Sequence, residues 1–564
     1  MINVICLLII IGILLVMLLE KWEGRLGGNI DVGSGSPSLN YKKGFYFLVI
    51  YGLIAVRCIG LGSIPGGFNQ DGAMGAVDAL ALSQYGTDRF GTWLPAHFKA
   101  WSYGQMSVLL SYFTVPFIKL WGLSSLTARL PMCIASLLGA GAVYRIVKEM
   151  YSRNAALIAL IFLAINPWHF MQSRWALDCN LFPHMFVIGL YLLYKGIERH
   201  KYLYFSMVFF ALCMYCYGVA FYMVPFFLLI TCIILLVEKQ VKIKSVLICA
   251  AIYFSCSFSI YGTMLINFMG WETVRLPFVT MPYFEGSVRA NDIVFFSEEP
   301  LKQLAVNFRA LINVVFLQKP DLIWNAIDDF GTMYLCSMPL ILLGVGITIY
   351  QLIKSEDSHR RHGCILLLTY WGCSIFTGLC INSVNVNRIN IIFYSHIIFA
   401  GIAIYYIVRS WRKMAFLFIG VYGLLSILFF NHYFTTWAQQ MEDVFYSDFL
   451  EAVQYAGELE CDYYYITPDT QYEGSANVSE ILTMFAQQID ARYYQGQTNR
   501  FMGNEISFLD RYKFRNPSPE EINTRQYTAY VVKTDKISQF NEEEFWIKRF
   551  DSYSVAVPRQ YVTW

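Results

Sequence analysis

Long apolar runs separated by short polar stretches make up most of this chain. Between residues 44 and 430 the runs recur at lengths of about 17 to 22 residues, enough to cross the roughly 30 Å hydrocarbon core of a membrane. After residue 430 the apolar runs shorten to strand length, and amphipathic stretches lie between them. The pattern predicts an α-helical polytopic membrane protein of about twelve transmembrane helices, followed by a small C-terminal α/β domain.

Four short stretches predict the fold of the C-terminal domain. Residues 461–467 and 527–532 are rich in tyrosine, valine and isoleucine and favour buried strands. Residues 445–459 and 479–488 have helical periodicity and favour amphipathic helices. We expect this domain to act as a lid or a scaffold without chemistry of its own.

Basic residues in the polar loops predict the direction of each span. Loops rich in lysine and arginine stay in the cytoplasm, which places residues 20–43 inside and residues 63–122, the first outer loop, outside. A span at 106–121 would put the basic residues after position 144 outside, so we expect an interfacial helix there. The expected parts are an N-terminal helix and cytoplasmic connector (1–43), a membrane domain (44–430) with a long outer segment (263–332), and an outer domain (431–564).

Composition narrows the class of partner. Charged residues make up 15% of the chain, against about 25% in soluble domains, so we expect membrane lipids around most of it. The net charge is only +2, and the chain contains no long basic run. We therefore expect no nucleic-acid partner. Most of the 14 cysteines lie inside apolar runs, where they act as small apolar side chains. We therefore expect neither a zinc site nor a disulfide framework.

One acidic residue lies where the chain leaves the second apolar run. Asp71 is part of the polar, glycine-rich stretch at 67–72, within a few residues of the expected bilayer surface. An ionisable group so close to lipid is costly and is a candidate for function. The alternative is that Asp71 caps the helix that opens at Gly72. Asp78 falls on the same helical face, seven residues after Asp71. We interpret it as a structural acid that is exposed to solvent.

The other expected outer loops hold a short set of charged groups. Arginine side chains bind phosphate leaving groups, and a carboxylate can act as general base on an acceptor hydroxyl or amine. Simpler alternatives are arginines that reach to the interface and an aspartate that caps a helix. The candidates are Asp71 and Asp178 for catalysis, Arg388, Arg174 and Lys99 for a phosphate, and His97, Trp175 and Asn387 for the rest of the substrate.

The order of these motifs resembles a known superfamily. The acidic loop is followed by LSSLTARLP at 123–131, by NPW at 166–168, and by Arg174 and Asp178. This order, over about residues 44–410, resembles the GT-C glycosyltransferases that use polyprenyl-phosphate sugars. The nearest branches are the protein O-mannosyltransferases, of the family 39 type, and the lipid A aminoarabinose transferases. The resemblance implies an essential acid near the acceptor at Asp71, a second acid at Asp178, and a lipid-phosphate contact at Arg388.

Two departures from the family pattern limit what the resemblance implies. The family often has an Asp-Glu pair in the first loop, where this chain has Asp71 and Gly72. A Lys-Pro pair meets the donor phosphate in the aminoarabinose transferases, whereas this chain has Gly104 and Gln105, with Lys99 slightly upstream. Some relatives of the oligosaccharyltransferase type use a divalent metal, but we favour no metal and no other cofactor here.

Together these observations predict an integral-membrane glycosyltransferase of the cell envelope. It would move a sugar from a polyprenyl-phosphate donor to an acceptor on the extracytoplasmic face, with Asp71 as the base or as the group that orients the acceptor. The acceptor is a protein, a cell-wall polymer or a lipid. The alternative is a transporter or flippase for a lipid-linked glycan, which would place its polar groups near the bilayer midplane.

Overall fold

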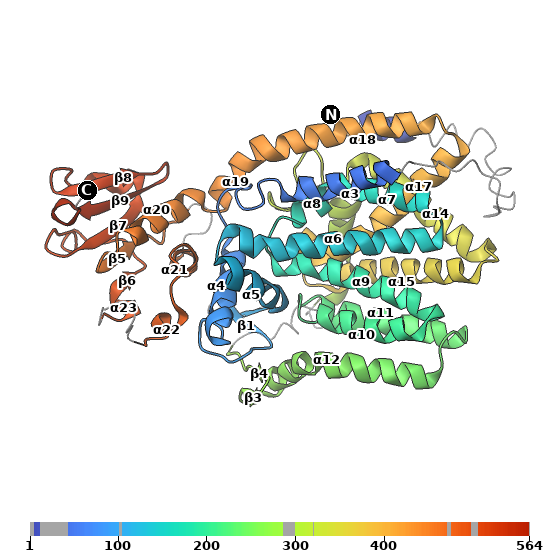
Figure 1. Ribbon diagram of the computed structural model, residues 1–564, viewed down its shortest axis with the longest axis horizontal. Helices are drawn as coiled ribbons and strands as arrows, with labels where there is room; N and C mark the ends of the chain where they lie inside the picture. The colour runs from blue at the N-terminus through green and yellow to red at the C-terminus, as the bar shows by residue number, and fades with distance from the viewer. Residues whose placement is uncertain are drawn as a thin grey trace.

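The computed structural model describes residues 5–11, 43–100, 104–285, 299–319, 321–470, 475–497 and 506–562. The connector predicted at 20–43 lies almost wholly outside these residues. The elements form a helical bundle joined to a smaller domain that contains a sheet (Figure 1). The predicted fold class, a polytopic helical protein with a small C-terminal α/β domain, is confirmed.

Most of the chain up to Val444 is helical. Among the described residues, seven helices are long and apolar enough to cross a membrane, and shorter apolar helices accompany them. The helices of this part are α3 (Lys43–Cys58), α4 (Gln70–Tyr85), α5 (Leu109–Trp121), α6 (Ser125–Met150), α7 (Arg153–Ala164), α8 (Pro167–Gln172), α9 (Asp178–Glu198), α10 (His200–Cys213), α11 (Ala220–Val237), α12 (Ile243–Met269), α13 (Pro300–Leu311), η3 (Ile312–Phe316), η4 (Leu335–Ser337), α14 (Met338–Lys354), α15 (Ser358–Cys380), α16 (Val386–Ile389), η5 (Asn390–Ile392), α17 (Phe393–Ser410), α18 (Met414–His432), η6 (Tyr433–Trp437) and α19 (Ala438–Val444).

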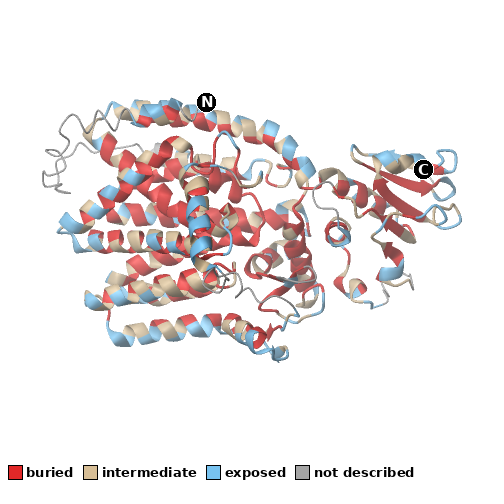
Figure 2. Cartoon of the chain, turned by 180° about the vertical axis from the view of Figure 1, so that it is seen from behind, coloured by how far each residue is buried: buried red, intermediate tan, exposed pale blue. Residues whose placement is uncertain are grey.

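Small residues allow the central helices to pack closely. A Cβ on Gly344 of α14 would lie 2.1 Å from the Phe399 carbonyl oxygen of α17, and a Cβ on Gly401 would lie 2.7 Å from the Cβ of Ala159 on α7. Such contacts hold helices together in lipid, where no hydrophobic effect drives their association. Helix α17 is accordingly almost fully buried, whereas α12 and α18 expose much of their surface (Figure 2).

Helices α4 and α5 lie at the end of the bundle that is nearest to the C-terminal domain (Figure 1). They belong to the loop predicted at 63–122, which also holds a short hairpin of β1 (Phe98–Ala100) and β2 (Gly104–Met106). A second hairpin, β3 (Val274–Leu276) and β4 (Val279–Met281), packs beside it, because Ala96 N–H donates to the Thr280 carbonyl oxygen at 2.8 Å. Residues from two predicted outer segments therefore meet at this end of the bundle.

The helix after Met414 continues beyond the predicted domain boundary at 430. Helix α18 passes without interruption into η6 and then into α19, which ends at Val444. This continuous helix joins the bundle to the C-terminal domain (Figure 1). The change of composition at residue 431 was a poor boundary marker, because a helix that leaves the membrane remains a helix when its surroundings change from lipid to water and protein.

The C-terminal domain is a five-stranded sheet with helices. Its strand order is β6-β5-β7-β9-β8, with β5 parallel to β6 and β7, and with β9 antiparallel to β7 and β8. The strands and helices that were predicted from periodicity are confirmed as β5, β7, α20 and α21. The elements are α20 (Ser447–Glu458), β5 (Tyr463–Ile466), α21 (Ala476–Ala486), α22 (Ala491–Tyr494), α23 (Phe508–Arg511), β6 (Tyr512–Lys513), β7 (Thr528–Lys533), η7 (Thr534–Gln539), β8 (Phe545–Arg549), β9 (Tyr553–Pro558) and η8 (Arg559–Tyr561).

The C-terminal domain is docked directly onto α4. The Phe68 ring, just before α4, stacks on Phe485 of α21 with centroids 4.6 Å apart. At the other end of α4, the Tyr85 hydroxyl donates to the Asp490 carboxylate. The domain thus contacts the helix of Asp71 near both of its ends, as a scaffold would.

Candidate active site

Asp71 lies in the first turn of α4, but it does not cap that helix. The cap is Asn69, whose side-chain oxygen accepts the Asp71 N–H at 3.0 Å. The capping role considered for Asp71 is therefore wrong, because a neighbour two residues earlier fills it. The Asp71 side chain is half-exposed, and a carboxylate at this position is favoured by the partial positive charge of the helix N-terminus.

A glycine lets the first turn of α4 lie against the loop that precedes α9. A Cβ on Gly72 would lie 2.8 Å from the Ala176 carbonyl oxygen, so a larger residue would push the two segments apart. Gly72 and Asp178 line the same small cavity. The structure thus brings the turn that carries Asp71 to the loop that carries Asp178, the two acids predicted for catalysis.

Asp178 is the first residue of α9 and is buried. Its Oδ1 accepts the N–H of Cys179 at 2.7 Å, while the capping position itself is occupied by Leu177, which makes no side-chain capping bond. Asp178 is therefore not the capping residue of α9, although its carboxylate does accept one N–H near the helix start. Asp178 faces the same small cavity as Gly72, consistent with a role in shaping a pocket.

Arg174 is placed differently from what a phosphate ligand or an interfacial side chain requires. It is 1% exposed. Its guanidinium donates to the carbonyl oxygens of Arg57, Gly60 and Ile64 and to the Tyr433 hydroxyl, at 2.7 to 3.1 Å. Arg174 is therefore neither a phosphate ligand nor a side chain that reaches to the membrane interface. Its N–H donors are taken by backbone carbonyl oxygens, and through them it holds the segment that leads into α4.

Arg129 does the same from α6. It is 1% exposed, and it donates to the carbonyl oxygens of Leu61, Pro65 and Gly67 at 2.9 to 3.1 Å. Sequence reasoning used this arginine only as part of a motif. An arginine within an apolar run, followed by Leu-Pro, was the available signal, since a buried guanidinium persists only where it has enough acceptors.

We expect Arg129→Lys to weaken the fold near Asp71. An ammonium group cannot reach acceptors on three residues as the planar guanidinium does, so buried carbonyls would lose their donors. The expected loss is about 1–3 kcal/mol of stability, seen as a lower thermal midpoint in detergent. The matched control is Arg309→Lys on α13, an exposed arginine, which should leave the midpoint unchanged. Equal midpoints for both variants would contradict this role for Arg129.

The segment that carries Arg388 reaches the same region from the other side. Asn390 donates through Nδ2 to the Cys179 carbonyl oxygen at 2.9 Å, next to Asp178. Arg388 is half-buried, and its Nη1 donates to the Ser383 hydroxyl at 2.7 Å. The neighbouring Asn387 has a buried side-chain oxygen without a hydrogen-bond partner among the described residues. The predicted pair Asn387 and Arg388 therefore lies beside the loop that holds Asp178.

Trp175 contributes a buried donor to this region. Its indole Nε1 has no hydrogen-bond partner in the described part of the chain, and its ring lies edge-on to Trp324 with centroids 6.2 Å apart. Buried polar groups in proteins are nearly always paired. The indole N–H of Trp175 is therefore an unusual buried donor, and the substrate contact predicted for Trp175 stays a prediction.

His97 and Lys99 belong to a separate part of the first outer loop. His97 is buried and lies edge-on to Phe221 at 5.9 Å. Lys99 is exposed on β1, with its Nζ 5.6 Å from the centre of the Phe90 ring. Their predicted substrate contacts stay predictions.

Asp78 is not the solvated acid that the sequence suggested. It is fully buried and forms an ion pair with Arg89, which also donates its backbone N–H at 3.0 Å. Burial raises the pKa of Asp78 to about 7, against the lowering effect of the Arg89 guanidinium. The correction follows from the fold of residues 86–100, which covers this face of α4. Asp78 and Asp71 therefore have opposite surroundings although they share one helix.

The residues gathered at this end do not form a metal cluster. Among the described residues, no three histidine, cysteine, aspartate or glutamate side chains are grouped so that they could hold a metal ion. What the arrangement offers is a partly exposed carboxylate at a helix start, a second carboxylate on the loop packed against that turn, and a half-buried arginine on the adjoining segment. This set can accept a proton and bind an anion.

Fold and site together define a multi-pass membrane protein with a polar site at one end of its bundle. A family model described as dolichyl-phosphate-mannose-protein mannosyltransferase matches residues 106–260. No curated protein matches the sequence significantly. Two crystal structures of ArnT from Cupriavidus metallidurans are similar to the chain. The form bound to undecaprenyl phosphate has 11% identity and a TM-score of 0.55, over 93% of this chain and 99% of ArnT. The apo form has 12% identity and a TM-score of 0.54, over 91% and 98%.

A third structure, the apo oligosaccharyltransferase of Archaeoglobus fulgidus, has 13% identity and a TM-score of 0.47, over 79% of this chain and 64% of that one. The fold assignment rests on the two ArnT structures. The chain has the GT-C fold over nearly its whole length. The resemblance to the GT-C superfamily that was seen in the outer-loop motifs is confirmed.

Proposed function

We propose that this protein transfers a sugar from a polyprenyl-phosphate donor to an acceptor on the extracytoplasmic face of the membrane. The observation that carries the proposal is the position of Asp71, half-exposed at the start of α4 and packed against the loop of Asp178. The GT-C fold supports it, since the ArnT structure with that fold was solved with undecaprenyl phosphate bound. Basic loops at the opposite end of the bundle support the outward orientation of the site.

In the proposed reaction, the acceptor group attacks the anomeric carbon of the sugar from the side opposite the phosphate. The bond between that carbon and the phosphate oxygen breaks, the bond to the acceptor forms with inversion, and polyprenyl phosphate leaves. Asp71 takes the acceptor proton or orients the acceptor. Arg388 stabilises the charge that develops on the phosphate, and Asp178 shapes the pocket. The sugar and the acceptor are left open by this chemistry.

The alternative of a transporter receives no support from the placement of the polar groups. A transporter needs its polar groups near the bilayer midplane, whereas Asp71, Asp178 and Arg388 lie at helix starts at one end of the bundle.

The first test of the donor site concerns the lipid retained during purification. We expect mass spectrometry to find polyprenyl phosphate, with or without its sugar, bound to the wild-type protein in mild detergent. Arg388→Ala should lose this lipid by about tenfold or more, because a charge-assisted contact to phosphate is worth about 1.5–3 kcal/mol. Asp71→Asn should retain it, since Asp71 acts on the acceptor.

The matched control for that experiment is Arg309→Ala, which removes an exposed arginine from α13 in the predicted outer segment. It should retain the lipid as the wild type does. Equal retention in Arg388→Ala and Arg309→Ala would remove Arg388 from the donor site. Bulk phospholipid alone in every variant would remove the support for a polyprenyl-phosphate donor.

A further inference from the structure

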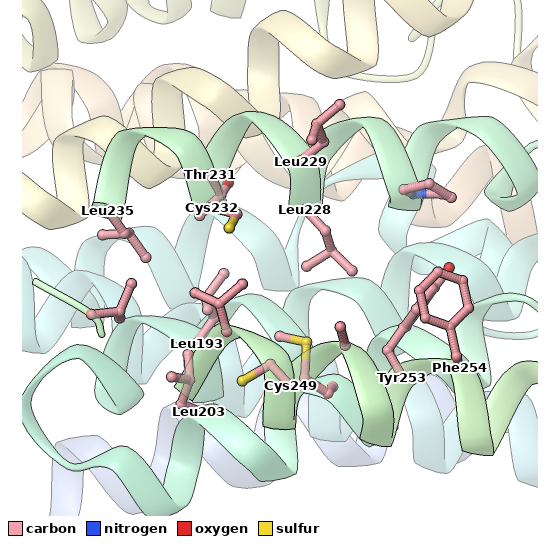
Figure 3. A pocket seen from close by; sticks show the side chains of 15 residues that line it. Leu193, Leu203, Leu228, Leu229, Thr231, Cys232, Leu235, Cys249, Tyr253 and Phe254 are labelled. Atoms are coloured by element: carbon pink, nitrogen blue, oxygen red, sulfur yellow. The ribbon is translucent and has the colours of Figure 1, made fainter. Parts of the chain in front are cut away.

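A cavity separate from the residues around Asp71 lies between three of the membrane helices. Helices α10, α11 and α12 leave a slot of about 280 Å³ between them (Figure 3). Its lining is almost entirely apolar, with side chains from all three helices and from α9. The lining residues include Leu203, Pro225, Leu229, Leu235, Ala250 and Phe254.

The slot runs along the helices for about the depth of one membrane leaflet. Its lining on α12 extends from Val246 to Phe254, which at 1.5 Å per residue is about 12 Å. On α11 it extends from Pro225 to Leu235, about 15 Å. Half of a hydrocarbon core of roughly 30 Å is also about 15 Å. The length therefore fits one alkyl chain that lies parallel to the helices within one leaflet.

The slot is open towards the membrane. Leu229 and Phe254, which line it, are 59% and 56% exposed. Helices α11 and α12 bury only about a third of their most apolar windows inside the protein. An apolar slot with such walls, in a helix pair that is loosely held by the rest of the bundle, accepts a hydrocarbon chain from the side.

Lysines surround the mouth of the slot. Val241 lines the slot in the turn between α11 and α12, and Lys239, Lys242 and Lys244 lie within three residues of it, all exposed. Lys201 lies two residues before Leu203, at the start of α10. Within the described part of the chain, none of these four lysines forms an ion pair, whereas the Glu238 carboxylate of the same turn faces the Arg361 guanidinium at 3.9 Å. The mouth therefore carries an uncompensated positive charge.

We propose that this slot binds one acyl chain of an anionic glycerophospholipid of the cytoplasmic leaflet, with the lipid phosphate at the lysines of the mouth. The lysine-rich turn places this end in the cytoplasm by the positive-inside rule. Each lysine near an anionic membrane surface contributes about 1 kcal/mol of attraction. The slot and its lysines are separate from the residues proposed to bind the donor, so the inference does not rest on the proposed function.

The test uses the full chain, reconstituted in vesicles that contain equal amounts of phosphatidylglycerol and phosphatidylcholine with the same acyl chains. After extraction in mild detergent, native mass spectrometry should find a single retained phosphatidylglycerol. Replacing both Lys242 and Lys244 with alanine should lower its excess over phosphatidylcholine by about tenfold or more. Ala250→Phe fills the slot and should abolish retention of both lipids.

Two control variants at the same end of the bundle separate this site from general lipid contact. Replacing Arg412 and Lys413 with alanine removes two exposed basic residues between α17 and α18. Ala415→Phe adds the same ring to α18 at a half-buried position outside the slot. Both should retain phosphatidylglycerol as the wild type does.

Three results would overturn the inference. The first is equal retention of the two lipids by the wild type, and the second is undiminished retention in Ala250→Phe. The third is displacement of phosphatidylglycerol by added polyprenyl phosphate at equal concentration, which would make the carrier lipid the occupant. Thermal unfolding of Ala250→Phe in detergent shows that the variant is folded, so that loss of lipid is not loss of structure.

Discussion

Asp71→Asn is expected to reduce sugar transfer by about 10² to 10⁴-fold, the usual contribution of a general base, without loss of the fold. Asparagine has the shape of aspartate and suits the first turn of a helix, so the capping bond from Asp71 N–H to Asn69 stays in place. What the variant loses is the ability to take a proton from the acceptor. The readout is release of free polyprenyl phosphate from a panel of polyprenyl-phosphate sugars in the presence of a membrane extract that supplies acceptors.

The matched control for Asp71 is Asp78→Asn, in the same helix. Asp78 is buried and paired with Arg89, so its loss leaves a buried guanidinium without a counter-charge and lowers stability. Its rate per folded molecule should stay within a few-fold of the wild type. Full transfer activity in Asp71→Asn would refute the assignment of Asp71, and an equal loss of rate in both variants would show that any disturbance of α4 is enough.

Gly67→Ala is expected to separate the C-terminal domain from α4. Gly67 has a φ of +69°, and a Cβ there would lie 2.0 Å from the Phe445 carbonyl oxygen. An ordinary carbon–oxygen contact is about 3.3 Å or more, so the joint between α19 and α20 would have to move by roughly 1 Å. That movement would break the bond from Phe68 N–H to the same oxygen, now 2.6 Å long. We expect a loss of about 3 kcal/mol or more.

Gly270→Ala is the matched control for this substitution. Gly270, which follows α12, has a similar φ of +68° in the left-handed region, but no atom lies within 4 Å of its expected Cβ. It should cost only the backbone strain of roughly 1–2 kcal/mol. Limited proteolysis should release the C-terminal domain from Gly67→Ala much faster than from Gly270→Ala, and transfer activity should fall with it. Equal proteolysis of the two variants would show that the joint tolerates the added carbon.

The parts of the fold that follow from local pattern were predictable. Apolar runs gave the bundle, and periodicity gave the strands at 463–466 and 528–533 and the helices that flank them. The predicted topology placed Asp71 and Asp178 on the same side of the membrane, but it could not predict that their segments touch, because a contact that joins these segments is between Gly72 and Ala176. A glycine that permits a close approach carries no signal about its partner.

The surroundings of the charged residues could not be predicted from local sequence. Asp71 and Asp78 share one helix, and what separates them is Arg89, eleven residues after Asp78, which folds back to pair with it. Arg174 looked like a phosphate ligand because it lies in an outer loop, but the donors on its guanidinium serve the carbonyl oxygens of a segment more than 100 residues earlier. Burial of such groups is a property of the tertiary fold.

The docking of the C-terminal domain on α4 also sets when the site can form during synthesis. Tyr85 and Asp490 are 405 residues apart, and the bond from Gln495 to the Arg89 carbonyl oxygen spans 406. Because chains emerge N-terminus first, the first outer loop leaves the ribosome long before its partners exist. The helix that carries Asp71 therefore lacks these contacts until nearly the whole protein has been translated. A chain that stops before α21 would contain the long apolar helices of the described residues and still lack the contacts that hold α4.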